Sequence, residues 1–201
     1  EEDGEKTFLQ DKSDLASWIE IEVPVFLKAG GKKDVPFTIK VPKNAEPGGH
    51  FAVIWWSTAP PTNGKQVSIV TRAGILMLLR VSGDIKEEGR LLSFSTADLK
   101  RIFWSFPVGF SAAFKNEGNV HLKPTGQITI KNILGRTKAV VKVNEYLLQT
   151  LPGSKRSFGP KWEIARFAFG LYKAEINLFY GESQKQVSQS VWFAVLPWKM
   201  L

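Results

Sequence analysis

The chain has 201 residues, of which 43% are hydrophobic, and it carries a formal net charge of +8. This length allows one large domain or two of about 100 residues, and the absence of cysteine excludes a disulfide framework and thiolate chemistry. A basic chain favours anionic partners, but its Lys and Arg residues are scattered in ones and twos, as on solvated strand faces.

Polar and apolar side chains alternate along the first part of the chain, which predicts β-strands rather than helices. Four strands are expected there, near residues 17–22, 35–41, 50–57 and 67–81. In PFTIKVP, for example, Phe37, Ile39 and Val41 share one face. The polar, glycine-containing segment VSGDIKEEGR then indicates a linker at 83–88.

The rest of the chain shows the alternating strands of a complete sandwich, and YKAEINLFY is the clearest of them. Only STADLKRIFW could hold a helical turn, capped by Ser95 or Thr96. We therefore expect an all-β chain of two tandem immunoglobulin-like β-sandwich domains, at 1–84 and 85–201. The first is expected to be incomplete and to lack its N-terminal strands, which a missing N-terminal segment or a second chain would supply.

A faint internal repeat supports this division, because GGHFAVI at 48–54 matches GLYKAEI at 170–176. In immunoglobulin-like sandwiches, a glycine, any residue and an aromatic open the strand in which a tyrosine ties down a corner of the fold. Tyr172 after Gly170 fits that role. Phe51 after Gly49 occupies the same place but lacks the hydroxyl, so no corner hydrogen bond is expected there. The stretch HFAVIWW then reads as a central sandwich strand with one face in the core.

No motif in the sequence carries catalytic or metal-binding chemistry. The two histidines, His50 and His121, are expected at a turn or strand edge and in a loop, without a second ligand at zinc spacing. Calcium loops, glycine-rich phosphate loops and the G-x-S-x-G nucleophile elbow do not occur. Carboxylate pairs could still meet in space, but without a motif we expect no enzyme, no catalytic residue, no cofactor and no metal.

The tryptophans are the residues whose chemistry best suits ligand binding, because exposed aromatic rings form stacking platforms. Trp162 and Trp198 lie beside Lys and Pro near expected loops and are the candidate ligand-binding residues. The others that we place are expected in the core: Trp18, Trp55, Trp104 and Trp192. Nucleic-acid binding would need basic residues interleaved with exposed aromatics. KRIFW and SKRSFGPKW come closest but are short and not repeated, so we expect no nucleic-acid partner.

The stretch SWIEIEVPVFLKAGGKKDVPFTIKVPKNAEPGGHFAVIWW resembles the first domain of bacterial WxL-interacting surface proteins. The matching motifs are, in order, Trp18-Ile19, the strand at 35–42, the turn at 45–48, and Phe51. The second half, with FKNEGNVHLKPTGQITI, LPGSKR and FGLYKAEINLFYG, looks like the immunoglobulin-like domains of membrane-anchored bacterial surface proteins.

The resemblance implies secretion, a transmembrane helix just beyond Leu201, and binding to cell-wall polysaccharide, peptidoglycan or partner surface proteins. It brings no catalytic residues with it. No stretch of the sequence itself reads as a signal peptide or a spanning helix, and the chain, which begins at Glu1 rather than Met, is expected to be a piece of a longer precursor.

We therefore expect a non-catalytic, extracytoplasmic segment of a bacterial cell-surface protein that works by adhesion or scaffold binding. Two alternatives from another class stay open at this point. One is a carbohydrate-binding accessory module, and the other is a periplasmic assembly chaperone. A basic nucleic-acid binder is a third and weaker alternative, which predicts binding that falls steeply with salt.

Overall fold

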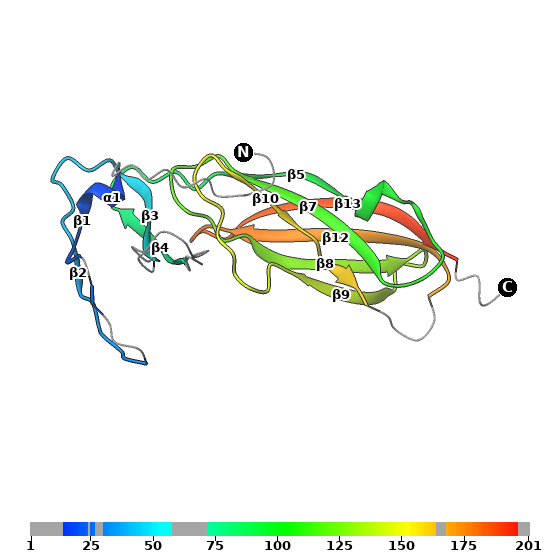
Figure 1. Cartoon of the computed structure of the whole chain (residues 1–201). Helices are drawn as coiled ribbons and strands as arrows, with labels where there is room; N and C mark the ends of the chain where they lie inside the picture. The colour runs from blue at the N-terminus through cyan, green and yellow to red at the C-terminus, as the bar shows by residue number, and fades with distance from the viewer. Residues whose placement is uncertain (1–13, 24, 27–29, 58–71, 164–167, 197–201) are drawn as a thin grey trace. The chain divides into compact units, whose positions relative to one another are not determined.

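The structure, a computed structural model, describes residues 14–23, 25–26, 30–57, 72–163 and 168–196 (Figure 1). These residues form strands almost throughout, and several sheets pack together, which confirms the predicted all-β sandwich class. The chain divides into two compact units between Asp84 and Ile85. That point lies inside the segment in which the sequence indicates a linker.

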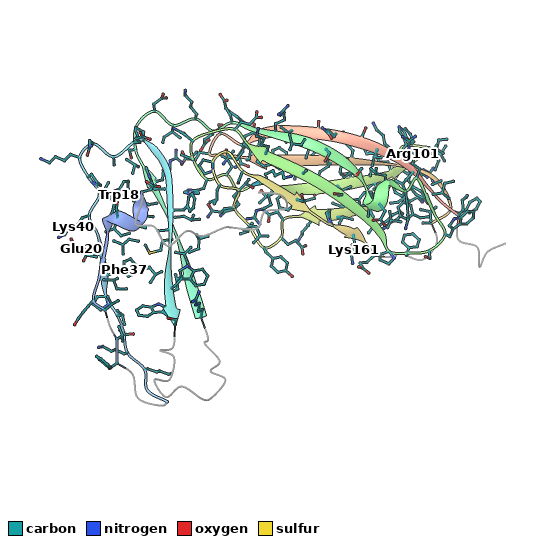
Figure 2. All side chains as sticks on the ribbon, turned by 45° about the horizontal axis from the view of Figure 1, so that its top comes forward. Trp18, Glu20, Phe37, Lys40, Arg101 and Lys161 are labelled. Atoms are coloured by element: carbon teal, nitrogen blue, oxygen red, sulfur yellow. The ribbon has the colours of Figure 1, made fainter. Side chains whose placement is uncertain are left out.

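The first unit contains one helical turn and four described strands. They are α1 (Leu15–Trp18), β1 (Ile19–Ile21), β2 (Phe37–Ile39), β3 (Gly48–Ser57) and β4 (Arg72–Val81). β1 pairs with β2 and β3 pairs with β4, in both cases antiparallel, so the described strands form two separate two-stranded sheets. An ion pair of 2.8 Å between Lys40 and Glu20 lies beside the β1–β2 ladder (Figure 2).

The prediction that HFAVIWW is a central strand is wrong for the part of the chain that the structure describes, but one of its faces is more buried than the other, as expected, since His50 and Ala52 are buried. There, β3 has β4 as its one strand partner. Among the hydrophobic residues described up to Asp84, Leu15 and Ala52 alone are buried, whereas Phe51 and Trp55 are exposed. The physical reason is the number of strands, because the described strands form two separate two-stranded sheets, and these do not enclose an extended core.

The second unit has a larger set of strands. Its elements are β5 (Gly89–Thr96), the 3₁₀ turn η1 (Ala97–Leu99), β6 (Ile102–Phe103), β7 (Val108–Asn116), β8 (Thr125–Asn132), β9 (Thr137–Val143), β10 (Lys155–Phe158), β11 (Lys161–Trp162), β12 (Gly170–Tyr180) and β13 (Lys185–Val195). In one sheet, β7 pairs with β5 on one side and with β10 and then β11 on the other. The second sheet has the order β6-β13-β12-β8-β9.

These two sheets enclose one hydrophobic core, which makes the second unit a closed sandwich of the immunoglobulin-like type (Figure 1). Alternate residues of each strand point inward, as the period of two requires. The central strands supply the largest share: Val108, Phe110, Ala112 and Phe114 from β7, and Tyr172, Ala174, Ile176 and Leu178 from β12. The outward residues between them are more accessible to solvent.

The helical turn expected in STADLKRIFW is reduced to the single turn η1. Thr96 is extended, and its hydroxyl donates to the carbonyl of Lys100 instead of capping a helix. Asp98 within the turn has a φ of 54°, which ends any regular helix at once.

Candidate binding site

Two glycines mark equivalent positions in the two units. Gly48 opens β3 with a φ of 140°, and Gly170 opens β12 with a φ of 108°. Both values are rarely adopted by residues with a Cβ. With these glycines matched, His50 corresponds to Tyr172, and the inward residues that follow also correspond. This match agrees with the ranges 48–54 and 170–176 of the repeat but differs by one residue from the predicted corner, which paired Gly49 with Gly170.

Tyr172 forms the predicted corner. Its ring is almost fully buried, and its hydroxyl donates to the backbone carbonyl of Phe169 at 3.3 Å. Burial raises the pKa of the Tyr172 hydroxyl, against the lowering effect of the Phe169 carbonyl. This short link fixes the turn that leads into β12, as a tyrosine corner does in immunoglobulin-like sandwiches.

The corner expectation for Gly49 and Phe51 is corrected by the structure. Phe51 is 40% exposed and points away from the face that carries His50, because a shift of one residue along a strand reverses the face. His50 stands in the corner position instead, with its Nε2 atom 2.8 Å from the carbonyl oxygen of Glu46. The first unit therefore has a corner hydrogen bond, made by a histidine that the sequence pattern assigned only to a turn or strand edge.

His50 makes a second polar contact, since its Nδ1 atom lies 2.5 Å from the Oδ1 atom of Asp14. Trp18 of α1 packs on the imidazole, with 4.6 Å between ring centroids. Burial by itself lowers the pKa of His50, but the Glu46 carbonyl and the Asp14 carboxylate outweigh burial, and the pKa is raised above 6.5. Both ring nitrogens face acceptors, so the protonated ring can donate to both at once.

An open apolar groove lies in the first unit and is a candidate for a binding site. Its volume is about 810 Å³. The lining residues come from the segments before β2 and from the end of the β3–β4 hairpin where β3 finishes and β4 begins: Val25, Lys33, Asp34, Val35, Pro36, Trp56 and Ile75. Most of this lining is apolar, and Lys33 and Asp34 supply one charge of each sign. Such a groove suits an apolar ligand held by a few polar contacts.

The β3–β4 hairpin is apolar on both faces. Trp56 and Ile75 belong to the face that includes the groove, since Ile75 lies opposite Ile54 in the ladder. The other face carries Phe51, Val53, Trp55, Leu76 and Leu78. Trp55 is 52% exposed, and its ring covers Gly74 on the neighbouring strand so closely that a Cβ there would lie 2.7 Å from it. Strands that are apolar on both faces are typical of the inside of a larger structure.

The prediction that Trp162 is a surface ligand-binding residue is contradicted by the structure. Trp162 lies in β11, is 3% exposed, and packs edge-on against Phe106, Tyr172 and Phe193. The alternation in Lys161-Trp162-Glu163 indicates an inward side chain, and that signal could have placed it in the core. Trp198, the other predicted binding residue, lies outside the described residues.

The tryptophans expected in the core are mostly at the surface. Trp55, Trp104 and Trp192 are exposed, and Trp18 is partly buried. The sequence pattern also failed to identify Trp56 as a groove residue. Its neighbours at 51–56 are apolar in an unbroken run, so alternation gave no indication of the face that each tryptophan occupies.

The described residues offer neither a metal centre nor a membrane-spanning helix. They contain no group of three or more His, Cys, Asp or Glu side chains that could hold a metal ion. His50 lies in the first unit and His121 in the second. No helix among these residues is both long enough and apolar enough to cross a membrane.

Comparison with known proteins gives no family assignment. No protein-family model matches the sequence, and no curated protein sequence matches it.

Proposed function

We propose that the chain is a non-catalytic binding segment of a bacterial cell-surface protein, and that its first unit accepts an extended strand from a partner surface protein. The observation that carries this proposal is the open apolar groove beside a hairpin that is apolar on both faces. Exposed apolar surface of this kind is a mark of an interaction site.

Comparison with the second unit indicates the position that an incoming strand would take in the first unit. In the second unit, β12 lies between β13 and β8, and β7 lies across the core from them. The first unit has β3 and β4 in the places of β12 and β13, but none of its described strands takes the place of β8 beside β3. An incoming strand beside β3 would add backbone hydrogen bonds, and its alternate side chains would enter the groove.

The incoming strand belongs in this proposal to a second chain, the partner surface protein. The resemblance of residues 17–56 to WxL-interacting surface proteins supports an extracytoplasmic location and an anchor in a transmembrane helix beyond Leu201. Cell-wall polysaccharide or peptidoglycan is the other class of ligand that this resemblance suggests. The net charge of +8 is compatible with anionic wall polymers.

Peptide selection tests strand acceptance and does not require that the partner be identified first. A phage library of short random peptides is selected on the chain, and enriched peptides are compared on the variants Trp56→Ser and Trp192→Ser. We expect enriched peptides to alternate apolar and polar residues, to bind the Trp192→Ser control as well as the original chain, and to lose binding to Trp56→Ser. Enrichment that does not depend on Trp56, or no enrichment, contradicts the proposal.

A carbohydrate-binding module is the second candidate, because Trp192 is exposed beside Lys173 on the neighbouring strand. Sedimentation with purified peptidoglycan, with soluble polysaccharide and with DNA, each over a range of salt concentrations, compares the remaining classes. Binding of a glycan that the Trp192→Ser variant loses would favour the module. Binding of DNA that falls steeply with salt would favour the nucleic-acid alternative.

A further inference from the structure

One end of the second unit gathers apolar side chains from separate turns. β13 ends there, β12 begins there, and β6 pairs with the last residues of β13. The turn between β8 and β9 lies at the same end, because Asn132 is opposite Tyr172. We name this the apolar end and define it by six exposed residues: Leu99, Ile102, Trp104, Ile133, Leu134 and Phe169.

The exposure of these side chains is high for their size. Leu99 is 78% exposed, Phe169 is 61% exposed and Trp104 is 53% exposed. On the outer face of the adjoining sheet, Leu171 and Trp192 are exposed as well and continue the apolar surface. Isolated exposed hydrophobic residues are normal, but a group at one end of a unit that includes tryptophan and phenylalanine indicates a contact surface.

Carboxylates are unevenly distributed between the two ends of the same unit. The opposite end, where β5 begins and β12 finishes, carries five of the eight carboxylates present between residues 85 and 201: Glu87, Glu88, Glu117, Glu145 and Glu182. The apolar end carries Asp98, which pairs with Lys100 at 3.4 Å, and Glu163. Its basic residues are Lys100, Arg101, Arg136 and Lys161, so basic residues outnumber carboxylates there. The opposite end also carries basic residues, among them Lys86, Arg90, Lys115, Lys155 and Lys185. Figure 2 shows Arg101 and Lys161 at this end.

We propose that the apolar end docks on the surface of a membrane that contains anionic phospholipids. The apolar residues come from several separate turns, so they can enter the interface side by side without any strand being unpaired. Tryptophan is the side chain that lies most readily at the level of lipid headgroups. Basic side chains around it attract anionic headgroups, and they outnumber the two carboxylates at the same end. Insertion of apolar side chains and charge attraction together give reversible binding.

This inference is independent of strand acceptance in the first unit. It is tested by sedimentation of the whole 201-residue chain with vesicles of phosphatidylglycerol and, separately, of phosphatidylcholine. The test variant is Trp104→Ser with Phe169→Ser. The matched control is Tyr146→Ser with Leu148→Ser, which removes two exposed apolar side chains from the opposite end. A second test variant, Arg101→Glu with Lys161→Glu, reverses charge at the apolar end and keeps its hydrophobic residues.

We expect the original chain to bind phosphatidylglycerol vesicles more strongly than phosphatidylcholine vesicles. The Trp104/Phe169 variant should lose roughly tenfold in partitioning, the Arg101/Lys161 variant should lose the preference for phosphatidylglycerol, and the control should bind as the original chain does. No binding of the original chain to either vesicle overturns the proposal and points to a protein partner for this end. Equal loss in the Trp104/Phe169 variant and the control also overturns it, because binding would then not be specific to the apolar end.

Discussion

The β3–β4 hairpin of the first unit and the β12–β13 hairpin of the second unit begin alike and end in different environments. Each opens at a glycine with positive φ, and each continues with a corner residue, an alanine and an isoleucine on its inner face. In β12 the alanine and isoleucine are fully buried, whereas Ile54 of β3 is only partly buried. The hairpin sequence therefore does not create the core by itself. The neighbouring strands do.

The outer faces of the two hairpins differ in chemistry. At matching positions, β12 carries Lys173 and Glu175 where β3 carries Phe51 and Val53. Charged residues on β12 are suited to water, and alternation of apolar and charged residues is typical of an antiparallel sheet with one solvated face. The apolar outer face of β3 is therefore suited to a contact that the described part of the first unit does not contain.

The largest expected difference in stability is between the same substitution at the two matching isoleucines. Ile176→Ala should lower the free energy of unfolding of the second unit by about 2–5 kcal/mol, because Ile176 is fully buried among well-packed neighbours. Ile54→Ala should cost less than about 1 kcal/mol, because Ile54 loses less buried surface. Hydrogen exchange of each hairpin under increasing urea measures both. Equal losses would mean that β3 already has a core of its own.

A smaller effect is expected at the tyrosine corner. Tyr172→Phe removes the hydroxyl that donates to Phe169 and should lower the free energy of unfolding by about 0.5–1.5 kcal/mol. The ring and its packing are retained, so the midpoint of urea denaturation should fall without a change in the dependence of the unfolding free energy on urea concentration. An unchanged midpoint would show that the corner hydrogen bond contributes nothing to stability.

The stability of the corner in the first unit should depend on pH, whereas the stability of the corner in the second unit should not change over the same pH range. The pKa of His50 is raised above 6.5 in the folded chain. The contacts to Asp14 and Glu46 therefore stabilise the folded state fully below pH 6.5, and this stabilisation is lost as pH rises through the raised pKa. NMR titration of the imidazole gives the pKa, and amide exchange in β3 gives the stability. His50→Gln should remove the pH dependence, with β12 as an internal control.

The smallest effect on stability is expected when the charged residue types on the outer face of β12 replace the apolar residues at the matching positions of β3. Phe51→Lys with Val53→Glu should change the free energy of unfolding by no more than about 0.5 kcal/mol, because both side chains lie on the outer face. The same variant should associate less with itself and should bind fewer of the selected peptides, because charges on an exposed strand oppose pairing. Analytical ultracentrifugation measures the association. A large loss of stability would show that this face is already covered in the isolated chain.

The prediction of the fold succeeded where one face of a strand is clearly polar. The alternation of Tyr172, Ala174 and Ile176 with Lys173 and Glu175 identified both a strand and its inner face, and the structure agrees. The corner in the first unit was misplaced by one residue because His50 and Phe51 are both aromatic and adjacent. Only the backbone, with positive φ at Gly48, decides between them.

The candidate site was harder to predict than the fold. The predictions for Trp162 and Trp192 were both wrong. Trp162 was expected at the surface and lies in the core, whereas Trp192 was expected in the core and lies at the surface. Val191, Trp192 and Phe193 are all apolar, so period alone could not say which side chain points outward. The pairing of β13 with β12 determines the faces, because Phe193 is opposite Tyr172 and Trp192 is opposite Lys173.

By itself, the sequence determined that this protein is built of β-strands, and it predicted that the chain divides near residues 83–88 and that the first part is short of strands. These properties follow from local alternation and from the number of strands, both of which can be read along the chain. Only the tertiary structure decided which tryptophans are exposed, where the groove opens, and that apolar turns gather at one end of the second unit. Those features depend on strand register and on which strands become neighbours. Long-range pairing of this kind cannot be predicted from the residues of any one segment.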